Sequence, residues 1–183
     1  MFPFPTAPGA SEPPRVLIVD DDRDVHDAYE RCLAPPRRES EALARARDEL
    51  FGPLPSSTTG EAPQFELAHA YGGEEGVRTV QRQLAAGRPF AAAFVDMRMP
   101  PGWNGVDTIK GIWRLDPAVQ IVLSTAYSDF TWDKVLAAVG RSAGLHLLRK
   151  PFDPAQVLRF AEVLCRKWQL AAESRLTASG LQR

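Results

Sequence analysis

Short runs of apolar residues alternate along this chain with longer segments in which apolar residues recur every three or four positions. The runs have the length of buried strands and are too short to be helices. The second run alternates apolar and polar side chains, which is typical of an edge strand or of a strand with one solvated face. The five predicted strands are Arg15–Asp20, Phe65–Ala70, Phe90–Val95, Val119–Ser124 and Leu145–Leu148.

The segments between these runs have the spacing of amphipathic helices. In the last of them Val157, Ala161, Leu164 and Trp168 share one face, which continues to Ala171 or Ala172. The five predicted helices are Asp24–Leu33, Gly73–Ala86, Gly105–Leu115, a helix capped by Ser128 or Asp129 that runs to about Val139, and a helix capped by Asp153 that runs to about Leu176.

A strand and a helix therefore alternate five times, which predicts an α/β fold with a doubly wound, five-stranded parallel sheet covered by helices on both faces. An insertion at about 35–63 follows the first helix. It combines helical spacing at Glu39–Phe51 with a loop at Gly52–Pro63, and it is either a surface elaboration or a partner or dimer surface. We expect a disordered proline-rich tail at 1–14, one domain at 15–170, and a helical linker or tail at 171–183.

Composition narrows the class of protein. A net charge of -1 over 183 residues gives no broad basic surface, so no direct binding of nucleic acid or membrane is expected. No apolar run has membrane-spanning length, and no signal peptide is recognisable, so the default location is the cytoplasm. Cys32 and Cys165 have no metal-binding spacing, and both are expected to be small apolar side chains rather than a disulfide.

The candidate chemistry lies where the predicted strands end. Asp20 ends the first predicted strand and Asp21 follows it, and Asp96 follows the third. The carboxyl ends of parallel strands meet at one edge of a sheet, where α/β proteins bind their ligands. Carboxylates gathered there repel one another, so the pattern implies a bound cation. Thr125 and Lys150 follow the fourth and fifth strands at the same edge.

Four segments at these ends, VLIVDDD, FVDMRMPPGWNG, LSTA and LRKPF, resemble the response-regulator receiver domain, the phosphoacceptor module of two-component signalling. The resemblance covers about residues 15–170 and implies a flavodoxin-like fold with strand order 2-1-3-4-5. In its long insertion and in the residues of these motifs, the chain is similar to the receiver subgroup attached to hybrid histidine kinases or cyclic-di-GMP enzymes.

The resemblance also implies roles for individual residues. Asp96 would be the phosphoacceptor, and Lys150 and Thr125 would bind the phosphoryl oxygens. Mg²⁺ would be held by Asp20, Asp21, Asp96 and the backbone carbonyl of Arg98, with Asp20 acting mostly through a metal-bound water. The Lys150–Pro151 bond would be cis. Asp22, by contrast, suits a turn or a helix cap.

As a receiver, the chain would not be a stand-alone enzyme. A sensor histidine kinase or phosphotransfer protein would phosphorylate it, and the surface of the fourth helix, fifth strand and fifth helix would change. The resemblance is compatible with a homodimer and with an output domain that lies outside this chain. The alternative is a degenerate receiver that acts as a phosphorylation-independent interaction module.

The chain departs from the usual receiver pattern at one switch position. Many receivers have an aromatic residue three positions before the site lysine, where this chain has Leu147. By the same resemblance, Arg98 and Tyr127 occupy positions that influence phosphoryl lifetime in receivers. Because both side chains are bulky, they would predict a phosphoryl group that lives longer than in fast chemotaxis-type receivers. Trp103 is expected either to anchor its loop or to contact a partner.

Overall fold

The computed structural model of the chain describes residues 12–33, 64–126, 132–140 and 142–180. The expected insertion, the tail up to residue 11 and the predicted caps Ser128 and Asp129 lie outside the described residues.

Five parallel strands form one sheet, as the sequence predicts, and their order β2-β1-β3-β4-β5 is the one that the resemblance implies. The edge strand β2 is half-buried along most of its length, in line with its alternating sequence, whereas β1, β3 and β4 are buried throughout. The strands are β1 (Arg15–Val19), β2 (Glu66–Ala70), β3 (Ala92–Asp96), β4 (Gln120–Thr125) and β5 (Leu145–Arg149).

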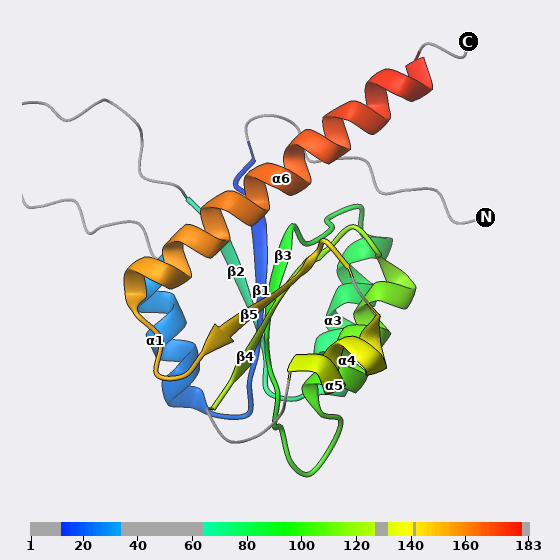
Figure 1. Cartoon of the computed structure of the whole chain (residues 1–183). Helices are drawn as coiled ribbons and strands as arrows, with labels where there is room; N and C mark the ends of the chain where they lie inside the picture. The colour runs from blue at the N-terminus through cyan, green and yellow to red at the C-terminus, as the bar shows by residue number, and fades with distance from the viewer. Residues whose placement is uncertain (1–11, 34–63, 127–131, 141, 181–183) are drawn as a thin grey trace, which may run out of the picture.

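Helices cover both faces of this sheet (Figure 1). Helices α1 and α6 lie on one face, and α3, α4 and α5 lie on the other (Figure 1). The helices are α1 (Arg23–Leu33), α3 (Gly73–Ala85), α4 (Gly105–Leu115), α5 (Trp132–Val139) and α6 (Pro154–Gly180).

The alternation of side chains along β1 divides the core between these two faces. Val16 and Ile18 pack toward α1 and α6, while Leu17 and Val19 belong to the cluster beneath α3, α4 and α5. A strand buried on both sides needs apolar residues at every position, which explains the uninterrupted Val-Leu-Ile-Val run.

The inner face of α6 is the one predicted from its spacing. Val157, Ala161, Leu164 and Trp168 are buried, and Ala172 rather than Ala171 continues the stripe. The predicted end at about Leu176 is four residues short, because α6 runs to Gly180. The apolar stripe marks where α6 packs on the domain. The backbone continues beyond it, since no proline interrupts the remaining residues.

Several further boundaries differ from the sequence expectation, mostly by one residue. The third strand begins at Ala92 rather than Phe90, and the first helix begins at Arg23, one residue earlier than predicted. Phe90 and Ala91 are as buried as the strand itself, so apolar character does not distinguish the strand from the two residues that precede it. Within the described residues, no helix is long and apolar enough to span a membrane.

Both cysteines carry free thiols, as expected, but their environments differ. Cys165 is 2% exposed, and burial raises the pKa of its thiol to about 12, whereas Cys32 is only half-buried. Near pH 8 a thiol with a pKa of about 12 is ionised to roughly one part in 10⁴. We therefore expect Ellman's reagent to modify Cys32 in the native protein and Cys165 only after unfolding. Rapid labelling of a native Cys32→Ala variant would contradict this.

Candidate functional site

The carboxyl ends of four strands bring the predicted residues to one edge of the sheet. Asp96 is paired in register with Ser124, and Thr125 with Arg149, so the ends of β3, β4 and β5 are level. The backbone N–H of Lys150 donates to the carbonyl of Thr125 at 2.9 Å, which continues this pairing one residue beyond β5. Asp20 is tied to the edge strand in the same way, by a 3.2 Å bond from its N–H to the Ala70 carbonyl.

An ion-pair cluster of Asp20, Asp96 and Lys150 forms the centre of the site. The Nζ atom of Lys150 lies 2.8 Å from Oδ2 of Asp20 and 2.6 Å from Oδ1 of Asp96. The two aspartates are only 2% and 7% exposed. One ammonium group thus joins three strand ends and partly neutralises two buried carboxylates that would otherwise repel each other.

Backbone amides bind the remaining oxygen of each carboxylate. Oδ1 of Asp20 accepts from the N–H of Asp22 at 3.0 Å, and Oδ2 of Asp96 accepts from the N–H of Arg98 at 2.6 Å. Each carboxylate therefore receives one hydrogen bond from the ammonium group and one from the backbone. Bonds of this kind hold the carboxylate plane in one orientation.

Burial and charge act in opposite directions on the titration of this cluster. Burial raises the pKa of the Asp20 carboxyl, opposed by the hydrogen bond from Lys150. Burial alone lowers the pKa of the Lys150 ammonium, but its hydrogen bonds to Asp20 and Asp96 outweigh that effect and raise it overall. Lys150 is therefore a fixed cation at neutral pH.

Thr125 lies at the same edge and is nearly buried. Its hydroxyl donates to the carbonyl of Ala126 at 3.1 Å and makes no hydrogen bond to either aspartate. Asp21 is exposed, and the structure does not bring it into the ion-pair cluster. Oδ1 of Asp22 accepts from the N–H of Asp24 at 2.9 Å, which confirms its predicted part in the turn before α1.

The chemistry of the donor set suits a hard divalent cation. Mg²⁺ binds to carboxylate oxygens and keeps several waters, so it needs only one or two protein carboxylates. Asp20 and Asp96 meet that requirement. Among the described residues, however, no group of three or more His, Cys, Asp or Glu side chains is close enough to hold a metal ion. The participation of Asp21 and of the Arg98 carbonyl stays a prediction.

A close approach between β3 and α4 holds the backbone of the phosphoacceptor candidate. The N–H of Gly105 donates to the carbonyl of Met97 at 3.0 Å, and the side chain of Asn104 caps α4 by accepting from the N–H of Asp107. The Lys150–Pro151 peptide bond is cis, as the resemblance implies, and Pro100–Pro101 is cis as well.

A histidine pair behind Asp20 is a feature that the sequence did not reveal. His26 is buried, its Nε2 lies 2.8 Å from the Asp20 carbonyl oxygen, and its Nδ1 lies 2.7 Å from Nδ1 of His69. Because a carbonyl can only accept, Nε2 of His26 must donate, so in neutral His26 Nδ1 accepts from His69. The position of His26 on the buried face of α1, six residues after Asp20, was the available signal.

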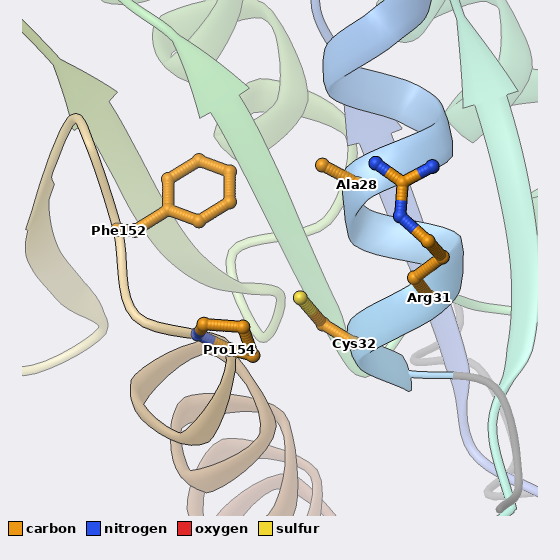
Figure 2. Close-up of a pocket in the computed structure, with 5 residues that line it drawn as sticks. All are labelled: Ala28, Arg31, Cys32, Phe152 and Pro154. Atoms are coloured by element: carbon orange, nitrogen blue, oxygen red, sulfur yellow. The ribbon is translucent and has the colours of Figure 1, made fainter.

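The aromatic rings near the site come from α1, β3 and the loop after β5. Leu147 is half-buried in β5. The ring of Tyr29 instead packs between Phe94 and Phe152, with centroid distances of 5.0 and 4.8 Å. Phe152 also lines a depression of about 180 Å³ between α1 and the start of α6, together with Cys32 and Pro154 (Figure 2). The stack thus links α1 both to the strand of Asp96 and to the loop of Lys150.

Removing the bridging ammonium should destabilise the fold. In Lys150→Met the buried carboxylates of Asp20 and Asp96 lose their cation, a change that costs about 2–4 kcal/mol of unfolding free energy. The loss should shrink as the pH falls. Burial raises the pKa of the Asp20 carboxyl, and once this carboxyl is protonated it no longer needs a neighbouring cation. Urea denaturation of both proteins at neutral and acidic pH measures this difference.

The matched control is Lys134→Met, which removes an exposed lysine of α5 and should change stability by less than about 0.5 kcal/mol. Equal stability of Lys150→Met and the wild type at neutral pH would show that the bridge does not compensate the buried carboxylates.

Comparison with known proteins supports the fold expectation. No family model matches the chain. A CheY-like response-regulator receiver domain from Methanospirillum hungatei JF-1 is 18% identical with a TM-score of 0.60, over 87% of this chain and 99% of that one. A response-regulator receiver protein from Sinorhizobium medicae WSM419 is 16% identical with a TM-score of 0.58, over 86% and 98%.

An adenylate cyclase from Rhodopirellula baltica has the same fold, at 18% identity and a TM-score of 0.64, over 92% of this chain and 98% of that one. Identities this low establish the fold and not the activity. The chain therefore has the fold of response-regulator receiver domains, with the sheet order that the sequence resemblance implies.

Proposed function

We propose that this chain is a phosphoacceptor receiver domain of a two-component phosphorelay and that Asp96 accepts the phosphoryl group. The observation that carries the proposal is the ammonium of Lys150, which binds Asp96 and Asp20 together at the carboxyl edge of a receiver-type sheet. In the transfer, the N–P bond of a donor phosphohistidine breaks, its electron pair stays on the imidazole, and an O–P bond forms to Asp96.

The residues around Asp96 have the properties that this step needs. Phosphoryl transfer relies mainly on positioning and on stabilising the charge of the equatorial oxygens. The Lys150 ammonium is already 2.6 Å from Asp96 and can contact a phosphoryl oxygen attached there. The hydroxyl of Thr125 can rotate from the Ala126 carbonyl to donate to another oxygen.

Mg²⁺ is the cofactor that fits this site. Asp20, Asp21, Asp96 and the Arg98 carbonyl would hold it, and when bound it would neutralise charge on the phosphoryl oxygens. A cation here would share the two carboxylates with Lys150, so we infer that Lys150 keeps the acidic edge compact in the metal-free protein.

The partners follow from the same proposal. A sensor histidine kinase or a phosphotransfer protein would supply the phosphoryl group in the cytoplasm. The response would pass through the surface of α5, β5 and α6, which are the fourth helix, fifth strand and fifth helix of the sequence expectation. The length of α6 supports a signalling linker toward a homodimer or an output domain outside this chain.

The test is phosphoryl uptake from acetyl phosphate in the presence of Mg²⁺. We expect intact-protein mass spectrometry to show the addition of one phosphoryl group, lost on treatment with hydroxylamine as an acyl phosphate should be. Borohydride reduction and peptide mapping should place it on Asp96. A label on another residue, or no label, would refute the proposal. An unlabelled protein that still bound its kinase would instead be the degenerate interaction module.

A further inference from the structure

A groove beside the candidate site is lined by aromatic and proline side chains. It has a volume of about 290 Å³ and lies between the connection from β2 to α3 and the loop from β3 to α4. Tyr71 and Trp103, two of the four exposed large apolar residues in the described chain, line it together with Pro100 and Pro101. They are 45% and 37% exposed, although burial would be favourable for both rings.

Contacts with neighbouring residues hold both rings in place. The ring of Tyr71 packs on His26 with a centroid distance of 4.4 Å, and the guanidinium of Arg23 lies 5.2 Å from its centroid. Trp103 approaches α4 so closely that a side chain at Gly111 would meet its indole at 3.0 Å. Walls that are already ordered lose little entropy when a ligand binds.

The groove is open beside Gly72 and Gly102, and the two carboxylates on its rim already have partners. A Cβ atom added at Gly72 or Gly102 would meet nothing within 4 Å. Glu74 pairs with Arg78 at 3.6 Å, and the carboxylate of Glu75 accepts from the N–H of Tyr71 at 2.7 Å. The groove therefore suits an uncharged ligand, and its aromatic and proline walls suit an extended proline-rich segment.

The chain itself contains a segment of this chemistry. Residues 1–11, which lie outside the described residues, have the sequence MFPFPTAPGAS, with two phenylalanines, three prolines and no charged side chain. Rigid aromatic and proline residues dock on aromatic grooves at a low entropic cost.

The segment is also long enough to reach the groove. The carbonyl of Pro14 accepts from the N–H of Glu66, so the chain enters the fold beside the first residue of β2. Tyr71 directly follows the last residue of β2, about 17 Å away at the rise of an extended strand. Eleven residues in a polyproline conformation span about 34 Å.

We propose that residues 1–11 dock into the groove formed by Tyr71, Trp103 and Pro100–Pro101. The docked segment would cover the loop that follows Asp96. The proposal goes beyond the receiver function and does not depend on it, because docking requires neither metal nor phosphorylation.

The experiment compares two full-length proteins by NMR. One is the wild type, and the other is a tail variant in which serine replaces Phe2, Pro3, Phe4, Pro5 and Pro8. The indole N–H signal of Trp103, assigned by its loss in Trp103→Phe, should differ between the two proteins. A synthetic peptide of residues 1–11 should move the signal of the tail variant toward the wild-type position and leave the wild type unchanged.

A groove-filling substitution provides the matched control. Gly102→Leu adds a side chain where the structure has open space, so the fold should persist. In the tail-variant background it should weaken peptide binding by at least about tenfold, or about 1.4 kcal/mol. Identical Trp103 signals in wild type and tail variant, or undiminished binding to Gly102→Leu, would overturn the proposal. A wild-type signal that changes with protein concentration would assign the docking to a second copy and overturn the intramolecular form.

Discussion

Asp96→Asn should reduce phosphoryl uptake from acetyl phosphate by at least roughly a thousandfold, because the amide that replaces the carboxylate has no nucleophilic oxygen anion. Rates of labelling, measured by intact-protein mass spectrometry in excess Mg²⁺, give this ratio directly. The substitution keeps the shape of the side chain and leaves the 2.8 Å bridge between Lys150 and Asp20 in place. The folded structure should therefore survive, with a melting temperature within about 4 °C of the wild type.

The control for this variant is Asp133→Asn, which removes one exposed carboxylate from α5 without touching the ion-pair cluster. It should be phosphorylated at the wild-type rate. Wild-type labelling of Asp96→Asn with an intact fold would show that another residue accepts the phosphoryl group, and the assignment of Asp96 would then be wrong.

Gly105→Ala should destabilise the protein by about 2–4 kcal/mol and also slow phosphoryl uptake. A Cβ atom at Gly105 would lie 2.6 Å from the carbonyl oxygen of Asp96 and 2.9 Å from the Cα of Met97. Both are backbone atoms of the segment that carries the proposed phosphoacceptor, so the clash cannot be relieved by rotating a side chain. The start of α4 would move away from the end of β3, and Asp96 would move with it.

Urea denaturation of Gly105→Ala, with Gly102→Ala as the matched control, measures this effect. Gly102 lies three residues earlier in the same loop, and a Cβ atom there would meet nothing within 4 Å. We expect Gly102→Ala to stay within about 0.5 kcal/mol of the wild type. Similar stabilities for the two variants would show that the loop can absorb the methyl group and that the close approach is not required.

The fold was predictable because its strongest signals are local. A strand such as β1, buried on both faces, needs an uninterrupted apolar run, and the helices that cover it need apolar residues on one side only. Boundaries were less certain, as the starts of β3 and α1 and the end of α6 show. Apolar character reports burial, and buried residues extend beyond the hydrogen-bonded strand at Phe90 and Ala91.

The candidate site was only partly predictable. Strand topology alone implied that Asp20, Asp96, Thr125 and Lys150 would meet at one edge, and the structure places all four there. It leaves Asp21 exposed, outside the ion-pair cluster. The contact of His26 with the Asp20 carbonyl and with His69 was not predictable, because a histidine on an apolar helical face usually has a packing role.

The sequence by itself determined the order of strands and helices, the apolar faces of the helices and the position of each carboxylate relative to a strand end. These properties depend on residues close together in the chain. The tertiary structure decided which charges touch. The bridge from Lys150 to Asp20 joins residues 130 positions apart, and it forms because β1 and β5 end at the same edge of one sheet. The same is true of the Tyr71–Trp103 groove, whose two walls become neighbours only when the loops after β2 and β3 lie side by side.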